Sequence, residues 1–140
     1  MILIKSWQDA QQEAYPIRKL VFIEEQGVPE EMELDELDPL AQHALAYLDS
    51  QCIGTARLLA PSGTTGRIGR MAVLPQYRKQ GHGGRLLRAL LEQGQSKGIT
   101  QFELHAQLSA IPFYEQFGFI AQGATYDEAG IAHRDMILSI

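Results

Sequence analysis

The stretch Met71–Gly84, MAVLPQYRKQGHGG, decides how the rest of the chain is read. An apolar run ends at Pro75, two cations and a glutamine follow, and three glycines then stand within four residues. Leucines at helical spacing begin directly afterwards and continue to Gly98, a residue typical of a helix C-terminus. This order predicts a strand, a glycine-rich turn and the start of a helix.

The turn has the chemistry of an anion site. Backbone N–H groups at a helix N-terminus lack intrahelical acceptors, and the helix dipole adds partial positive charge there. The glycines allow positive φ and close approach of a ligand, while the cations, and His82 once protonated, add charge. We therefore expect a phosphate or pyrophosphate to bind here. The residues expected to hold it are Arg78, Lys79, Gln80, Gly81, His82, Gly83 and Gly84.

Neither a GxxxxGK[ST] nor a GxGxxG pattern is present, which argues against a Walker loop and a dinucleotide fingerprint. A nucleotide-binding module that uses the same glycine-rich turn is an alternative that the sequence leaves open. Nucleic acid is not expected as a partner, because the net charge is −5 and the basic run 67–88 has no interleaved aromatic residue except Tyr77.

Composition predicts one ordinary globular domain. The 140 residues are 45% hydrophobic and 21% charged, enough to bury a core without disulfides. No apolar run approaches the ~20 residues that span a bilayer, and the N-terminus lacks a signal-peptide pattern. With a single cysteine, Cys52, these features predict a cytoplasmic protein that does not enter a membrane.

Hydrophobic patterning predicts a single α/β (α+β) domain over residues 1–140. The sheet is expected to be mixed and mostly antiparallel, because short joints separate successive strand patterns. The region 8–25 reads as helical, with Pro16 kinking it or starting a second helix. Segment 26–40 reads mostly as loop. The other expected strands are 1–5, 43–49, 52–60, 66–74 and 100–106, followed by a short helix at 109–117 and closing strands.

Two motifs carry a family resemblance. The run Arg78–Gly83 (RKQGHG) matches the R/Q-x-x-G-x-G/A signature of the GNAT superfamily of acyl-CoA-dependent N-acyltransferases, whose loop binds the coenzyme A pyrophosphate. The run Phe113–Phe119 (FYEQFGF) is similar to the second signature of that superfamily. The stretches VFIEEQGVP (21–29), AQ (106–107) and GIAH (130–133) resemble the ElaA-like branch, so the resemblance extends over nearly the whole chain.

The resemblance implies a splayed sheet flanked by helices and acetyl-CoA as cosubstrate. The main chain of Met71, Ala72 and Val73 would pair with the pantetheine arm like an added strand. A backbone N–H of Val73 or Met71 would polarise the thioester carbonyl. Gln107, Phe113 and Tyr114 would give further coenzyme contacts, and Tyr114 would protonate the departing thiolate. A homodimer is carried over as a habit of the superfamily alone.

Attack by an amine also needs a group that removes its proton. Many members of the superfamily carry a glutamate on the strand before the loop, and the strand Arg67–Leu74 has no acid. The lack of an acid on this strand leaves a non-catalytic coenzyme A-binding protein as an alternative. No metal is expected. The candidate bases are Glu25, His43, Glu103, His105 and His133. Glu103 and His105 share one face of their strand, where they are either a base or a structural pair.

The acceptor is expected to be a small-molecule or peptide amine. Residues 24–38 hold eight acidic residues and no lysine or arginine, and in the superfamily this region helps line the acceptor site. One hypothesis is a cationic acceptor such as a polyamine or a lysine side chain. The alternative is an acidic loop that serves solubility.

Overall fold

The computed structural model describes the backbone of residues 1–140 and the side chains of all of them except Pro61 and Ser62. A π-helical segment, Lys19–Glu25, continues the first helix, and short 3-10 turns cover Asp38–Leu40, Pro75–Tyr77 and Leu108–Ala110. The strands are β1 (Ile2–Ser6), β2 (Gln42–Leu48), β3 (Gln51–Ser62), β4 (Thr65–Val73), β5 (Gln101–Gln107), β6 (Ile120–Glu128) and β7 (Ile131–Ser139). The helices are α1 (Trp7–Arg18), α2 (Glu30–Glu33), α3 (His82–Ser96) and α4 (Ile111–Glu115).

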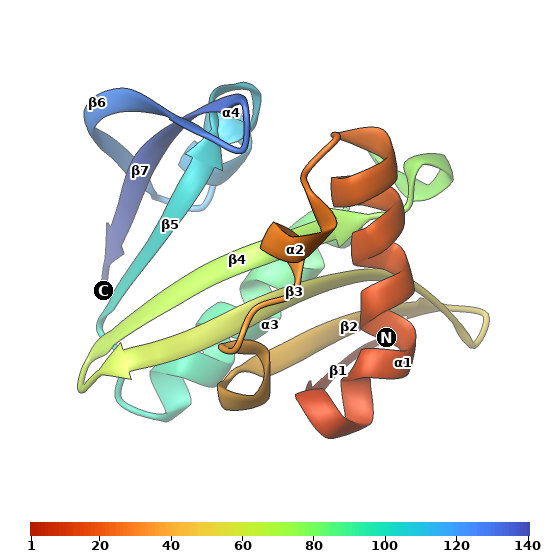
Figure 1. Cartoon of the computed structure of the whole chain (residues 1–140). Coiled ribbons are helices and arrows are strands. Elements are labelled where there is room, and N and C mark those ends of the chain that lie inside the picture. The colour runs from red at the N-terminus through yellow and green to blue at the C-terminus, as the bar shows by residue number, and fades with distance from the viewer.

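The strands form one sheet in the order β1-β2-β3-β4-β5-β7-β6 (Figure 1). Neighbouring strands are antiparallel except β4 and β5, which run parallel. The predicted mixed, mostly antiparallel sheet flanked by helices is confirmed. Among the described residues, no helix is long and apolar enough to cross a bilayer.

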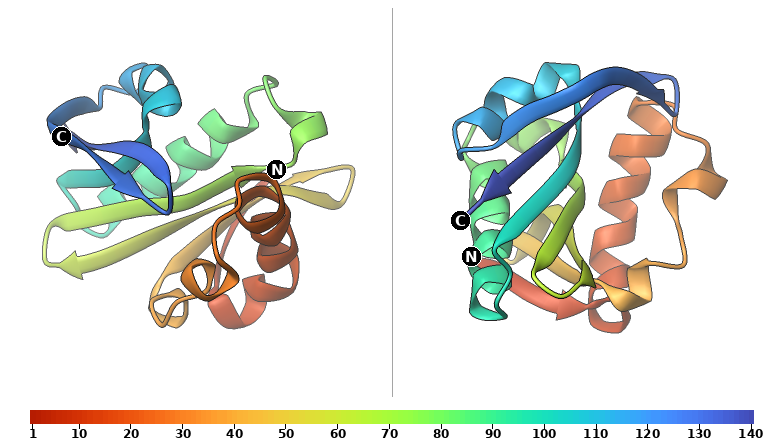
Figure 2. Two further views of the ribbon diagram at one scale, coloured as in Figure 1. Left: turned by 45° about the horizontal axis from the view of Figure 1, so that its top comes forward. Right: turned by 90° about the vertical axis from the view of Figure 1, so that its left-hand side faces the viewer.

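The helices α1 and α3 cover opposite faces of β2, β3 and β4 (Figure 2). The α3 side holds the larger core, where Leu86, Leu87 and Leu90 are fully buried. Gly94 lets α3 approach closely, because a Cβ there would lie 2.6 Å from the Phe102 ring. Gly98, at φ 86°, follows the end of α3, as its position in the sequence predicts.

Pro16 neither starts a new helix nor ends α1. It lies inside α1, which continues past Arg18 into the π-helical segment. Ala10 and Ala14 are fully buried, and Ile17 is nearly so, which indicates that packing on the sheet holds the helix through the proline. The part of the prediction that placed a second helix at Pro16 is wrong, because this tertiary packing outweighs the lost N–H donor.

The sheet opens between β4 and β5. The two strands pair at Thr65–Arg67 with Gln101–Glu103 and then diverge, which Figure 1 shows as a widening gap between their ribbons. On the other edge of β4, the register with β3 shifts by one residue at Arg70, whose φ is 51°. A bulge of this kind takes backbone groups out of the ladder. The fold therefore leaves main-chain donors and acceptors on β4 beside an open seam.

Candidate active site

A cavity of about 1190 Å³ lies where β4 and β5 diverge. Its lining includes residues of the loop before α3, of α2 and β3, and of the turn between β6 and β7. Met71, Val73, Gln107 and Tyr114 also line it. Of the residues predicted to contact the coenzyme, all line the cavity except Ala72 and Gln80. Ala72 packs against Ile17 and Val21 on the α1 face instead.

The loop before α3 has the backbone geometry of an anion nest. Lys79 and Gly81 adopt left-handed conformations, with φ of 62° and 86°. Arg85 N donates to Gly81 O at 3.1 Å in the first turn of α3, so the N–H groups before it have no acceptor within the helix. A Cβ at Gly83 would meet the Phe113 ring at 3.5 Å, which shows how close the loop lies to α4. The loop can thus direct several N–H groups at one phosphate.

Arg78 and His82 differ from expectation in this loop. The Arg78 guanidinium donates to both carboxylate oxygens of Glu25 at 2.7 Å and to the Val73 carbonyl at 2.9 Å, so it ties the loop to the π-helical segment. His82 is 5% exposed and receives a hydrogen bond from Arg85. Burial and the Arg85 charge lower the pKa of His82. This favours the uncharged imidazole, so the contribution of positive charge from a protonated His82 stays a prediction for acidic pH.

Tyr114 lies at the middle of the cavity on α4. Its ring packs edge-on against Phe113, with ring centroids 5.0 Å apart, and its hydroxyl contacts Met71 Sδ at 3.9 Å. Burial raises the pKa of Tyr114 to about 12. The phenol therefore keeps its proton at neutral pH, which is the state that a proton donor needs.

Three of the candidate bases lie outside the lining of the cavity. Glu25 is bound to Arg78, and the hydrogen bond from Arg78 lowers the pKa of Glu25, which makes it a weaker base. Glu103 accepts from Arg67 at 3.0 and 3.2 Å on the β5 surface. His43 is fully buried, with Nε2 2.9 Å from the Asp38 carbonyl.

The other two candidates, His105 and His133, line the cavity and share a partner. Glu128 lies 3.1 Å from His105 Nδ1 and 3.7 Å from His133 Nε2, bridging the two rings with its two oxygens. His133 Nδ1 is 2.7 Å from the Ile131 carbonyl, which can only accept, so the neutral ring leaves Nε2 free to take a proton. The Tyr126 ring stacks on His133.

Sequence reasoning missed Glu128. It stands at the end of β6, and no pattern around it marks it as functional. The turn Ala129-Gly130, with φ of 53° and 79°, reverses the chain and brings Glu128 opposite Ile131 and near His133. The one sequence feature that could have drawn attention to Glu128 is its position just before the GIAH stretch (130–133).

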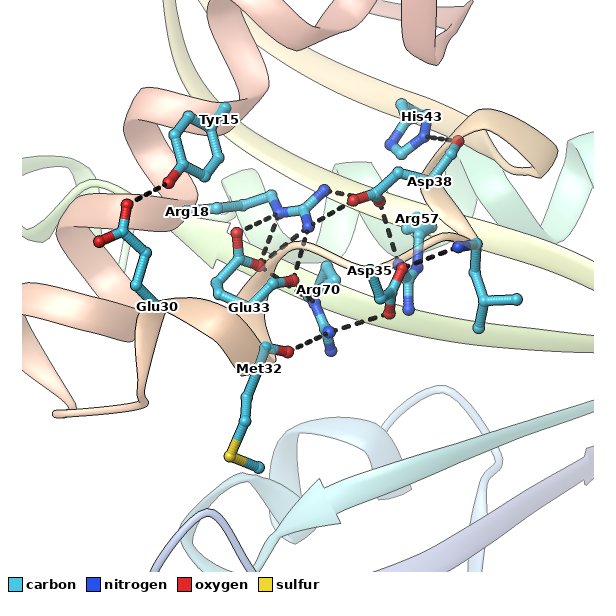
Figure 3. A network of polar contacts seen from close by, with 11 residues as sticks. Tyr15, Arg18, Glu30, Met32, Glu33, Asp35, Asp38, His43, Arg57 and Arg70 are labelled. Atoms are coloured by element: carbon cyan, nitrogen blue, oxygen red, sulfur yellow. Dashed lines mark hydrogen bonds and ion pairs between the residues drawn. The ribbon is translucent and has the colours of Figure 1, made fainter.

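The acidic segment is folded into a buried ion network (Figure 3). Arg18, 1% exposed, donates to Glu33 and Asp38 at 2.9 to 3.2 Å. Arg57 donates to Asp35 and Asp38. Arg70 pairs with Glu33 and Asp35, both at 3.1 Å. These arginines come from α1, β3 and β4, so the network fastens residues 33–38 to the sheet.

The ion network determines which acidic residues of 24–38 are available to an acceptor. Of the eight acidic residues in 24–38, all of them described by the structure, Glu33 alone lines the cavity, and it is 1% exposed. Ion pairs occupy Glu25, Glu33, Asp35 and Asp38. The segment therefore places no unpaired carboxylate on the cavity lining, and the hypothesis of a cationic acceptor gains no support from it.

Comparisons with known proteins agree with this geometry. The family model described as "Acetyltransferase (GNAT) domain" matches residues 8–140. A Bacillus subtilis protein named "Putative acetyltransferase BSU40680" is 42% identical over 123 residues, which are 86% of this chain and 83% of that protein.

Two solved structures share the fold. An acyl-CoA N-acyltransferase from Pseudomonas aeruginosa has a TM-score of 0.85 and 30% identity, covering 98% of this chain and 97% of that one. Escherichia coli ElaA has a TM-score of 0.88 and 26% identity, covering 98% of each chain. The chain belongs to the GNAT acetyltransferase family.

Proposed function

We propose that this chain transfers an acetyl group from acetyl-CoA to a primary amine by direct attack on the thioester. The observation that carries the proposal is the set of groups that line one cavity. They are an open helix N-terminus, a bulged strand, a protonated phenol and a carboxylate-bridged pair of histidines. The single cysteine supports a cytoplasmic location for this activity.

Each group has a role in the reaction. The N–H groups of the Lys79–Gly84 loop hold the pyrophosphate, and the β4 main chain pairs with the pantetheine arm. A backbone N–H of Met71 or Val73 stabilises the tetrahedral oxyanion, an effect of about 3 kcal/mol per donor. As the C–N bond forms, His133 Nε2 removes the amine proton, directly or through water, and Glu128 stabilises the resulting imidazolium. Tyr114 protonates the thiolate as the C–S bond breaks.

Calorimetric titration with acetyl-CoA tests the coenzyme part of this proposal. We expect a dissociation constant of about micromolar size, which corresponds to roughly 8 kcal/mol of binding free energy. ATP in excess should displace acetyl-CoA weakly, because it lacks the pantetheine arm that pairs with β4. The proposal is wrong about the loop if acetyl-CoA does not bind. It is wrong about the ligand class if ATP competes as well as coenzyme A does.

A further inference from the structure

The half of the cavity remote from α3 presents guanidinium groups. Arg57, Arg67 and Arg70 line it. Their carboxylate partners Asp35, Asp38 and Glu103 are not among the lining residues. Glu33, which pairs with Arg70, also lines the cavity but is 1% exposed and is bound by Arg18 as well, so the guanidinium groups outnumber the carboxylates of these pairs along the lining. Such a surface favours a ligand with negative charge.

Arg57 has unused hydrogen-bonding capacity. It is 6% exposed, and its Nη1 donates to Asp35 at 2.9 Å and to Asp38 at 3.0 Å. Its Nε is buried and has no partner among the described residues. Buried donors in folded proteins are nearly always paired, and an exception beside a cavity indicates a site for an acceptor group. An arginine already oriented by two carboxylates is well placed to bind a third oxyanion.

Arg70 connects this surface to the reacting centre. It occupies the β4 bulge with φ of 51°, a conformation that non-glycine residues rarely adopt and that clusters at functional sites. Its side chain is 26% exposed and is held by the Met32 and Glu33 carbonyls and by Asp35. Met71, whose N–H is a proposed oxyanion donor, is the next residue. Arg70 and the proposed oxyanion donor are thus adjacent in the chain, and both residues line the cavity.

We propose that the amine acceptor carries an anionic group, a carboxylate or a phosphate, that Arg57 and Arg70 bind. This rests on the proposed function, since it assigns the acceptor of the same site. Apolar side chains border the same part of the cavity and suit an apolar body between the amine and the anion. They are Met32, Leu37, Leu59 and Ile131. An acceptor of this class is an amino acid or a phosphorylated amine with an apolar chain.

Binding of product pairs tests the proposal without requiring turnover. Protein saturated with coenzyme A is titrated calorimetrically with N-acetyl-L-leucine and with N-(3-methylbutyl)acetamide, which has the same skeleton without the carboxylate. We expect the carboxylate to bind at least about tenfold tighter, as a charge-assisted hydrogen bond provides. N-acetyl-O-phosphoethanolamine forms the phosphate arm, and N-acetylputrescine forms the cationic arm. Preference for phosphate over carboxylate identifies the anion.

An arginine variant locates the anion site. Arg70→Gln should reduce the preference for the carboxylate to within about twofold while Arg70→Lys retains part of it, because lysine keeps the charge but not the planar fork. Arg134→Gln is the matched control, since Arg134 on β7 donates to the Gly123 carbonyl on β6 and does not line the cavity. Circular dichroism and coenzyme A binding establish that each variant is folded.

The outcomes separate this inference from the proposed function. The anionic acceptor is overturned, even if amines are acetylated, by equal affinity for both members of the leucine pair together with no binding of the phosphate compound. Tighter binding of N-acetylputrescine than of both anionic compounds also overturns it. Conversely, a carboxylate preference that Arg70→Gln abolishes supports the site even if no thiol is released. Should Arg70→Gln fail to fold, the wild-type pairs alone still decide the question.

Discussion

Packing, rather than a strong hydrogen bond, holds Tyr114 in place, since its hydroxyl is 3.9 Å from Met71 Sδ and its ring contacts Phe113 and Phe119. Removing the hydroxyl should therefore leave folding intact and remove the proton donor. We expect Tyr114→Phe to lower kcat by about 10²-fold, the usual contribution of a general acid, with the KM for acetyl-CoA within about threefold. Steady-state kinetics at saturating amine measure both.

Tyr15→Phe is the control, because Tyr15 contacts Glu30 on the surface through its hydroxyl. It should keep wild-type kcat. Since burial raises the pKa of Tyr114 to about 12, the wild-type rate should show no loss from Tyr114 deprotonation below about pH 11. A silent Tyr114→Phe variant would remove Tyr114 from the mechanism.

The two histidines at Glu128 can be told apart by substitution. His133 has its tautomer fixed by the Ile131 carbonyl, whereas His105 is 45% exposed on the side chain. We expect His133→Gln to lower kcat/KM by about 10²-fold or more, because it removes the acceptor of the amine proton. His105→Gln should lower kcat/KM by about tenfold at most. The reverse ranking in pH-resolved kinetics would make His105 the base.

At the scale of elements, the proposal assigns coenzyme binding to the N-terminus of α3. Gly83→Glu should weaken acetyl-CoA binding by about 10²-fold or more, because it fills the nest and places negative charge against the pyrophosphate. The control is Gln95→Glu, an exposed change of the same charge at the other end of α3. Calorimetry measures both variants. Retained binding by Gly83→Glu would move the pyrophosphate site away from the loop.

Elements with strong local signals could be predicted from the sequence. The glycines and leucines of 81–98 specify a turn and an amphipathic helix by themselves, and α3 follows them closely. The continuous helix through Pro16 and the ion pairs of the acidic segment could not be predicted from local sequence. Pro16 is retained in a helix by packing on a sheet whose strands come later in the chain. The carboxylates of 33–38 find their arginines on α1, β3 and β4.

At the scale of the whole molecule, buried histidines make stability depend on pH. Burial lowers the pKa of His43, whose Nε2 faces the Asp38 carbonyl and whose Nδ1 is buried with no partner among the described residues. The unfolded chain, with a histidine pKa near 6.5, binds this proton more readily than the folded chain does. Stability is therefore full above about pH 6.5 and falls as the pH drops toward the folded pKa.

Urea unfolding at several pH values measures this dependence. We expect the free energy of unfolding to fall between pH 7 and pH 5.5 by about 1 kcal/mol per histidine of this kind. His43→Gln should reduce the slope, since glutamine can donate to the Asp38 carbonyl and does not titrate. Stability that is constant or rises on acidification would contradict the buried neutral state of His43.

The histidine cluster also belongs to the whole molecule. His105 lies on β5, Glu128 ends β6, and β7 inserts between these strands and carries His133 opposite Gln107. This strand order is a property of the folded sheet, so the sequence offered His105 and His133 as separate candidates and did not indicate their common partner. The turn before α3 was predictable because it is local in sequence. The cluster of His105, Glu128 and His133 was not, because three strands build it.

Acceptor-dependent release of thiol from acetyl-CoA tests the central claim most directly. Release of free coenzyme A is followed with a thiol reagent against a panel of anionic, neutral and cationic primary amines. We predict release well above the amine-free rate with at least one class, and its loss in Tyr114→Phe and His133→Gln. If acetyl-CoA binds but no amine in the panel, including a lysine peptide, increases thiol release, the chain is a coenzyme A-binding protein without this activity.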